Sequence, residues 1–373
     1  MRTILSEYTN NRDNNFNLIR FIAASLVLYS HSFVLVTGIK HTDPIKNYLG
    51  MTWGWIAVDI FFVTSGFLIA SSFFTRNNIV AFVWARILRI YPALIVAVTF
   101  CVFVVGLFFT TNQISEYITN PQTYKYFLKN TTLFFGVKYN LPGAFADIPY
   151  KNVVNGSLWT LPYEVKMYAY LAILGTALLS FQKLLDKNIL KIVFLGIAVI
   201  AVLINIANHF QLFMSINFVR LFSMFFVGVA FYVYRNHIYL STKLFFLILT
   251  LLLVSIVHKG LFFVFYSVSL PYLIFYLAYV PSGTIRNFNK IGDYSYGIYI
   301  YAFLVQQSIM ATIPNVSVNS MIIISFSITF VLSFLSWHLI EKKFLKMKGS
   351  YVILENVLQN LYSKITDSRT KPS

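Results

Sequence analysis

An arginine and a histidine stand eleven residues apart in an otherwise apolar stretch, Asn17 to Ser32 (NLIRFIAASLVLYSHS). On a helix that rises about 1.5 Å per residue, Arg20 and His31 would be separated by roughly 16 Å, about half of a bilayer core. Ionisable groups inside a membrane are costly, so they generally face a protein interior or an aqueous cavity and serve a function. Because histidine accepts protons near neutral pH, His31 is a candidate general base. Its alternative role is a hydrogen bond that only supports packing.

Two carboxylates occur in later apolar stretches. Asp59 lies in WGWIAVDIFFVTSGFLIASSFF, about two turns below the outer end, and Ser65 with Gly66 would allow a close helix approach there. Glu164 lies in NGSLWTLPYEVKMYAY, roughly 12 Å along the axis from the outer surface. Pro162 frees backbone groups just before Glu164, which favours a broken, cavity-lining segment.

A pair of arginines precedes the third apolar run, in RILRIYP. Arg86 and Arg89 are three residues apart, so on a helix they would project from nearly one face at the inner boundary. Two guanidinium groups there could clamp an anion, because their fork geometry suits phosphate. The alternative is interfacial anchoring and topological charge, which needs no ligand.

The composition is that of a polytopic membrane protein. Of 373 residues, 58% are hydrophobic and only 11% are charged, which is far too apolar for an ordinary soluble protein. The formal charge of +17 comes from basic residues in short segments between apolar runs, so topology and anionic membrane lipid explain it and no nucleic acid partner is expected. The single cysteine, Cys101, excludes an intrachain disulfide. No metal and no permanently bound cofactor is expected.

Ten apolar runs are long enough to span a bilayer. They predict an all-α polytopic membrane protein with about ten transmembrane helices around a central cavity. With both termini inside, 20 of the 29 Lys and Arg residues fall on the inner side, 7 on the outer side and 2 within spans, which favours cytoplasmic termini. The predicted spans are about 17–37, 53–74, 90–110, 156–180, 189–207, 214–234, 244–260, 262–281, 294–314 and 319–339.

The remaining segments divide the chain into a membrane domain and a tail. The membrane domain is expected at residues 1–346, and its first apolar run serves as a retained signal anchor. Its long outer loop, 111–155, is rich in turn formers rather than in the pattern of a folded domain, and it could cover the outer mouth of a cavity. The cytoplasmic tail, 347–373, is expected to be a surface helix followed by disorder.

The predicted topology places the arginines on the inner side, Asp59 and Glu164 in the outer half, and His31 between them. This gradient suggests that two ligands meet at the histidine. The inner ligand would be an anionic donor with a long flexible arm, such as an acyl-CoA. The outer ligand would be polar and oriented by carboxylates and aromatic residues. Contacts to the acceptor, or structural support for them, are assigned to Asp59, Ser65, Trp159 and Tyr163.

Several blocks in order resemble the membrane acyltransferase-3 family, the integral membrane O-acyltransferases that modify sugars of bacterial surface polysaccharides and related glycans. The resemblance covers nearly all of residues 13–346. It rests on LIRFIAASLVLYSHS, VDIFFVTSGFLI, RILR, GSLWTLPYEVKMY, SYGIYIYAFLVQQ and IEKKFLKMK. The chain departs from many relatives at three positions, Ala302 and Leu304 in place of His and Pro, and Lys343 in place of Pro.

The resemblance implies ten catalytic-domain helices and an acyl-CoA donor used from the cytoplasm. It also implies that His31 is the catalytic residue and that Arg20, Arg86 and Arg89, which we assign to donor binding, occupy the family's signature positions. Glu164 matches the family's glutamate, and we assign it to the catalytic residues together with His31. Of the three departures, Ala302 and Leu304 could alter contacts to the acceptor, and none touches the arginine and histidine set.

The sequence therefore predicts an O-acyltransferase of the bacterial cytoplasmic (inner) membrane, acetyl being the expected acyl group and acetyl-CoA the expected co-substrate. The acceptor would be a hydroxyl of a lipid-linked or polymeric glycan, such as O antigen, capsule or exopolysaccharide. His31 would act as a general base or as a covalent acyl relay, and the residues do not separate the two mechanisms. The alternative function is a transporter or flippase of a lipid-linked sugar, which would need no arginine clamp. A purely structural partner would leave the buried charges unexplained.

Overall fold

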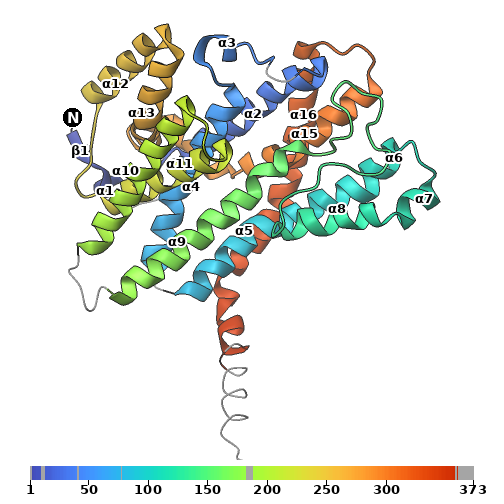
Figure 1. Cartoon of the computed structure of the whole chain (residues 1–373). Coiled ribbons are helices and arrows are strands. Elements are labelled where there is room, and N and C mark those ends of the chain that lie inside the picture. Colours follow the sequence, from blue (N-terminus) through green and yellow to red (C-terminus); the bar gives the residue numbers. More distant parts are fainter. Residues whose placement is uncertain are drawn as a thin grey trace, which may run out of the picture.

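The fold is almost entirely helical (Figure 1). The computed structural model describes residues 2–9, 13–39, 42–76, 78–181, 188–357 and 359. Short 3₁₀ and π-helical stretches join several of the helices. The elements in chain order are β1 (Arg2–Ile4), α1 (Leu5–Thr9), α2 (Phe16–Thr37), α3 (Lys46–Leu49), α4 (Trp53–Arg76), α5 (Ile79–Phe100), α6 (Leu107–Phe109), α7 (Ile114–Thr119), α8 (Pro121–Thr132), α9 (Leu161–Phe181), α10 (Ile189–Phe210), α11 (Ile216–Val233), β2 (Tyr239–Ser241), α12 (Thr242–Val254), α13 (Lys259–Tyr279), α14 (Phe288–Ile291), α15 (Ser295–Thr312), α16 (Val318–Ser336) and α17 (Lys342–Lys346).

The predicted all-α polytopic fold is confirmed, and a helix occupies each of the ten predicted positions. Among the described residues, seven helical stretches are both long and apolar enough to cross a membrane. They are 16–37, 53–76, 79–109, 189–210, 216–233, 259–279 and 318–357. The other three predicted spans coincide with α9, α12 and α15. Length and apolarity thus identify seven crossing helices, and ten remains a prediction.

The third span begins earlier than the apolar run predicted. The helix starts at Ile79 rather than near residue 90, because the side chain of Asn78 accepts a hydrogen bond from the Ala81 backbone N–H and caps it. Arg86 and Arg89 therefore lie well inside α5 instead of preceding it.

The segment 111–155 is more ordered than its turn-forming residues predicted. It contains α7 and the twelve-residue helix α8, which begins with Asn120 as its cap and Pro121 at its first position. An antiparallel bridge between Thr110 and Ala144 closes the segment. Both helices project from one side of the bundle (Figure 1).

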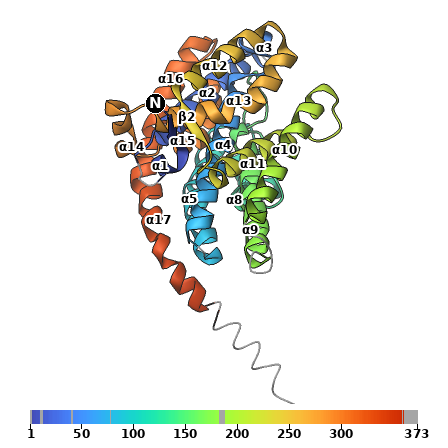
Figure 2. The same ribbon diagram turned by 90° about the vertical axis from the view of Figure 1, so that its left-hand side faces the viewer.

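The two ends of the chain are attached to the bundle differently. β1 pairs antiparallel with β2, and Leu5, just beyond β1, is fully buried, so residues 2–9 pack against the 235–241 connection. The helix that follows α16 runs on past the bundle (Figure 2) and stays helical to residue 357. Near its start, Trp84 of α5 donates a hydrogen bond to the Met347 carbonyl. The predicted disordered end of the tail, 360–373, lies outside the described residues.

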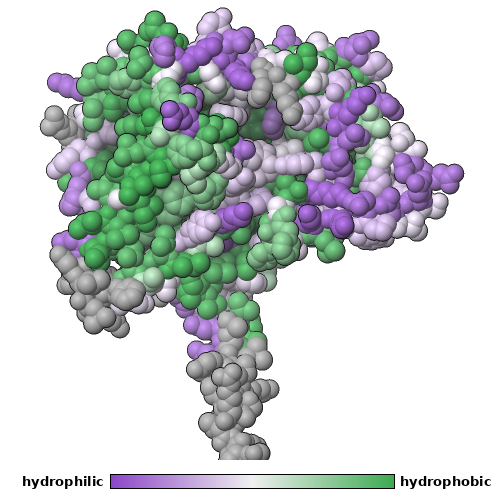
Figure 3. All heavy atoms as spheres, viewed as in Figure 1, coloured by the Kyte–Doolittle hydropathy of each residue, from purple (hydrophilic) through white to green (hydrophobic). Residues whose placement is uncertain are grey.

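The surface has the polarity of a protein that faces lipid. Figure 3 shows a broad hydrophobic area over the middle of one face, with hydrophilic residues along the top and over the projecting α7–α8 region. On α10, the side chains of Leu195, Val199 and Leu203 repeat every four residues and are all exposed. Apolar residues can face outward in this way because hydrocarbon, rather than water, surrounds a spanning helix.

Two glycines let α4 and α11 pack with their backbones in contact. A Cβ atom at Gly66 would lie 2.0 Å from the carbonyl oxygen of Phe225, and one at Gly228 would lie 2.2 Å from that of Val63. Small residues permit such close approach between membrane helices. This packing fixes α4, which carries residues of both cavities described below.

We expect Gly66→Ala and Gly228→Ala each to lower the thermal unfolding midpoint of the purified protein. The added methyl group must push the two backbones apart, and overpacking of this kind costs about 1–3 kcal/mol. Gly196→Ala in α10 is the matched control, because its Cβ would meet no atom within 4 Å. An unchanged midpoint in both α4–α11 variants would contradict the close packing.

Candidate active site

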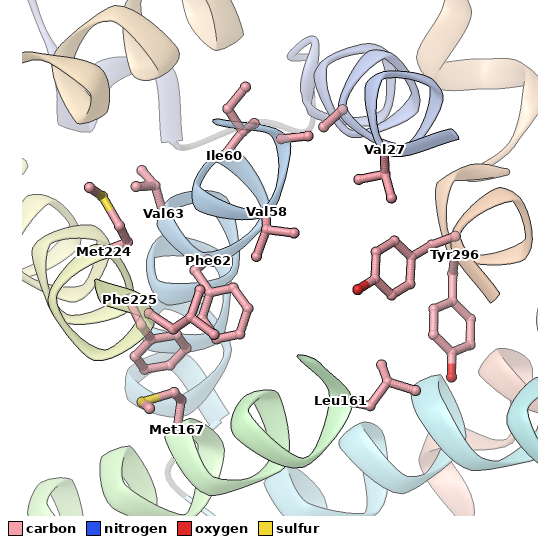
Figure 4. Packing of buried hydrophobic residues seen from close by; sticks show 14 of the residues in the cluster. Val27, Val58, Ile60, Phe62, Val63, Leu161, Met167, Met224, Phe225 and Tyr296 are labelled. Atoms are coloured by element: carbon pink, nitrogen blue, oxygen red, sulfur yellow. The ribbon is translucent and has the colours of Figure 1, made fainter. Parts of the chain in front are cut away.

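A cavity that we call the arginine cavity lies between α2, α4, α5, α9 and α15. It holds about 580 Å³ of empty space, counting the part open to the outside. Figure 4 shows Val58 and Phe62 of α4, Leu161 of α9 and Tyr296 of α15 around this space. The lining residues are Arg20, Val58, Phe61, Phe62, Ser65, Arg89, Ile90, Thr160, Leu161, Glu164, Tyr296 and Tyr299.

Two arginines of this cavity are held by buried carboxylates. Arg20 donates to Asp293 at 3.3 Å, and Arg89 donates to the same carboxylate oxygen at 2.5 Å. Arg89 also forms an ion pair with Glu341 at 3.4 Å. The cluster joins α2, α5, the loop before α15 and the segment after α16. A guanidinium has five N–H donors, so both arginines keep donors for a further anion.

Asp293 is charged at any physiological pH. Burial alone would raise the pKa of its carboxyl group, but Arg89, Arg20 and hydrogen bonds from Ser295 outweigh burial and hold that pKa at about 2. Asp293 therefore acts as a permanent anion between the two guanidinium groups.

Arg86 is separated from Arg89 by the helix geometry. Three residues of an α-helix turn through about 300°, so the two side chains point about 60° apart. Arg89 lines the arginine cavity, whereas Arg86 donates to Ser72 of α4 at 3.4 Å and lines an apolar groove between α5 and α9. No carboxylate among the described residues forms an ion pair with Arg86. Arg86 and Arg89 therefore share a face of α5 only approximately, and their side chains line different spaces.

Glu164 lies in the arginine cavity, not beside His31. It accepts a hydrogen bond from Tyr168 one turn along α9, and the Tyr168 hydroxyl lies 3.2 Å from that of Ser65. A 3₁₀ stretch at 156–160 precedes α9, and Pro162 takes the second helical position, where its missing N–H is not needed. The predicted break in this segment is therefore a change of helix type at Leu161.

A second cavity, which we call the histidine cavity, lies at the end of the bundle that carries segment 111–155. It holds about 1350 Å³ of empty space, counting the part open to the outside. Tyr139, Tyr150 and Val153 of segment 111–155 form part of its wall. The lining residues are Val27, Ser30, His31, Val34, Leu35, Thr52, Gly54, Trp55, Val58, Tyr139, Tyr150, Val153, Gly156, Trp159, Ile216, Asn217, Tyr299 and Phe303.

Among the residues that line this cavity, His31 is the side chain that can accept a proton near neutral pH. Its ring contacts Phe303 edge-on at 5.2 Å, and Gly156 leaves the space that Phe303 fills, since a Cβ there would lie 2.6 Å from the Phe303 ring. The Nδ1 atom is buried without a hydrogen-bond partner among the described residues. The adjacent Ser30 donates to the buried carboxylate of Asp43 at 2.7 Å.

The two cavities share one wall. Val58 and Tyr299 line both, and the Tyr299 hydroxyl is 2.6 Å from that of Thr160. Glu164 was expected to orient the outer, polar ligand, but it lies with the arginines. The structure brings Arg20, Arg89, Glu164 and Ser65 together on one side of the wall and places His31 and Trp159 on the other.

Asp59 faces neither cavity. It pairs with Arg220 of α11 at 3.5 Å and accepts a hydrogen bond from Tyr266 of α13 at 3.0 Å. Both charged side chains are 1% exposed. Of the aromatic residues predicted as support, Trp159 lines the histidine cavity and Tyr163 contacts its ring at 5.9 Å.

Sequence reasoning missed Asp293, Glu341, Arg220 and Trp55. The signal for the two carboxylates was their scarcity, since the chain has only 12 acidic residues against 29 basic ones. An acidic residue beside an apolar run is therefore a candidate partner for a buried arginine. No group of three or more His, Cys, Asp or Glu that could hold a metal ion occurs among the described residues.

The arrangement suits a reaction between two substrates. One side offers guanidinium groups to an anion, and the other offers an imidazole beside uncharged polar and aromatic side chains. The shared wall would bring the reacting ends together.

Comparison with known proteins identifies the family. The chain is 28% identical to the "O-acetyl transferase" of Shigella phage Sf6 over 366 residues, which cover 92% of this chain and 99% of that protein. It is 27% identical to "Nodulation protein 10" of Rhizobium leguminosarum bv. viciae over 366 residues, 93% of this chain and 97% of that protein. No solved structure matches. The acyltransferase domain of the acyltransferase-3 family matches residues 13–338, and the chain therefore belongs to this family of membrane acyltransferases.

Proposed function

We propose that this protein transfers an acetyl group from cytoplasmic acetyl-CoA to a sugar hydroxyl of a bacterial surface glycan. The observation that carries the proposal is the pair of cavities that share Val58 and Tyr299, one lined by arginines and the other by His31. The name of the phage Sf6 relative supports acetyl as the acyl group. The protein would lie in the cytoplasmic membrane with both termini in the cytoplasm, as the distribution of basic residues favours.

The donor would bind on the arginine side. Arg20 and Arg89 are preorganised by Asp293, which keeps their planes fixed without filling all their donors. Arg86 lies one turn closer to the cytoplasmic start of α5 and has no carboxylate partner among the described residues, so its full charge is available to the phosphates of coenzyme A. The long arm would then carry the thioester toward the shared wall.

The acceptor would bind on the histidine side. Apart from His31, none of the described residues that line this cavity is ionisable to a charge at neutral pH, and no carboxylate orients the ligand as the sequence predicted. Six of them are aromatic and others carry hydroxyl or amide groups, including Ser30, Thr52 and Asn217. A neutral sugar with hydroxyl groups and apolar C–H faces fits this lining.

The chemistry would be a single acyl transfer. His31 takes the proton of the glycan hydroxyl as its oxygen attacks the thioester carbonyl, the carbon–sulfur bond breaks, and the coenzyme A thiolate receives a proton. The products are an O-acetyl ester and free coenzyme A. The covalent relay, in which His31 itself carries the acetyl group, uses the same two cavities in two steps.

A lipid-linked glycan flippase is the second candidate function. It would share the apolar bundle and the buried charges, but it would need no arginine-lined cavity next to the cavity of His31. The deciding experiment supplies labelled acetyl-CoA to the purified protein and measures free coenzyme A and acetylated glycan. Sugar transport without release of coenzyme A would contradict the acyltransferase proposal.

Replacing His31 with Gln should abolish acetyl transfer, with a rate loss of about 10² to 10⁴, because the general base is removed while the size of the side chain is nearly kept. The measurement is the initial rate of glycan acetylation. His209→Gln is the matched control, because His209 stacks on Phe263 outside both cavities. Wild-type rates in His31→Gln would remove His31 from the chemistry.

The two arginines of α5 should differ when each is changed to alanine. Arg86→Ala should raise the donor KM without loss of stability. Arg86→Lys should lower the donor KM only part of the way back to the wild-type value, because a point charge lacks the bidentate fork of a guanidinium. Arg89→Ala leaves Glu341, which is 2% exposed, without its cation, and losing one partner of a buried pair costs on the order of 3–5 kcal/mol. Donor titrations and thermal midpoints of both variants test this. An unchanged donor KM in Arg86→Ala would return Arg86 to a topological role.

Glu164→Gln should raise the donor KM about tenfold or more and leave the acceptor KM nearly unchanged. Glu164 lines the donor side, and hydrogen bonds to a charged group contribute about 1.5–3 kcal/mol. Initial rates with each substrate titrated separately would show the effect, with the exposed Glu116→Gln as control. A raised acceptor KM at constant donor KM would instead support the acceptor role predicted from the sequence.

A further inference from the structure

A buried ion pair lies directly behind the wall of the histidine cavity. Arg220 of α11 and Asp59 of α4 are each 1% exposed, and Tyr266 of α13 donates a hydrogen bond to the same carboxylate. Buried ion pairs contribute little net stability, because desolvation of both charges offsets their attraction. The pair therefore calls for a role other than stability.

Arg220 contacts Trp55 in two ways. Its Cζ atom lies 4.5 Å from the centroid of the Trp55 ring, and its Nη1 donates to the Trp55 carbonyl oxygen at 3.4 Å. The Nε and Nη2 atoms of Arg220 are buried without a hydrogen-bond partner among the described residues. The indole face is thus a main compensating contact for this guanidinium, and a desolvated cation over a tryptophan ring is strongly attracted to it.

Trp55 belongs to the cavity wall, as do Ile216 and Asn217, which lie one turn before Arg220 on α11. The ring is therefore held from the protein side and contributes to the space in which His31 lies. A rigid indole offers a large apolar contact at a small cost in side-chain entropy. Hydroxyl and amide groups of Ser30 and Asn217 on the same wall can bind the polar edge of a sugar.

We infer that Trp55 is the platform on which the sugar ring of the acceptor stacks, and that Arg220, neutralised by Asp59, is the positioning residue that fixes this platform. The inference rests on the proposed function and adds to it the residue that selects a neutral pyranose ring. It also gives Asp59 a role at a distance from the reacting atoms.

The test uses the full-length protein in lipid nanodiscs with labelled acetyl-CoA and a panel of methyl glycosides as acceptors. Trp55→Leu should raise the KM for the best glycoside about tenfold, the effect of losing an aromatic contact, while kcat and the slow hydrolysis of acetyl-CoA by water stay near wild type. Trp55→Phe keeps a ring and should lose less.

Arg220 is tested through a double-mutant cycle. Arg220→Met should raise the same acceptor KM, Arg220→Lys should recover part of the loss, and the double variant Trp55→Leu with Arg220→Met should be no worse than Trp55→Leu alone. Additive effects would contradict the positioning role. If Arg220→Met does not fold, Asp59→Asn combined with Arg220→Met removes both charges of the pair and serves in its place.

Trp84→Leu is the matched control, because Trp84 bonds to the chain after α17, outside both cavities. A wild-type acceptor KM in Trp55→Leu would overturn the inference and leave the proposed function standing. Release of coenzyme A by the wild-type protein without acetylation of any glycoside would contradict the proposed acceptor, and the inference with it.

Discussion

The cost of burying charge within a membrane is the constraint on which the rest of this structure depends. Two carboxylates neutralise Arg20 and Arg89, and one neutralises Arg220. Each pair joins helices that are distant in the sequence, so the requirement for neutrality also sets which helices are neighbours. The first cluster ties α2 and α5 to the two ends of the α15–α16 pair, and the second ties α4 to α11. Arg20 and Arg89 of the first cluster line the arginine cavity, and Arg220 of the second contacts Trp55 on the wall of the histidine cavity.

Because burying charge is costly, buried groups that lack an ion-pair or hydrogen-bond partner indicate where a ligand could bind. Arg86 has no carboxylate partner among the described residues, and the buried Nδ1 of His31 has no hydrogen-bond partner there. A buried polar group left unpaired costs free energy that a ligand can recover. The two side chains lie in different places, His31 on the wall of the histidine cavity and Arg86 in the apolar groove between α5 and α9.

The position of a residue along its helix could be predicted from the sequence, but its direction around the helix axis could not. Hydropathy located a helix at each of the ten predicted positions, and residue counts placed Arg20 and His31 far apart along α2, where they line different cavities. Glu164 and Asp59 were assigned to the acceptor side from depth alone, yet one faces the arginine cavity and the other faces Arg220. The neighbours of a side chain depend on how helices that are distant in the sequence pack together, and the sequence of one helix does not determine that packing.

The wall between the cavities has a chemical consequence. A thioester exposed to water can be hydrolysed, so an acyltransferase gains from keeping the donor apart from the aqueous side until an acceptor is bound. Val58 offers only a small apolar side chain, and the hydroxyl of Tyr299 hydrogen-bonds with that of Thr160, just before α9. The continuous segment 156–164 carries Trp159 on the histidine side, in its 3₁₀ stretch, and Glu164 on the arginine side, in the first turn of α9. A small shift of this segment would therefore change the lining of both cavities at once.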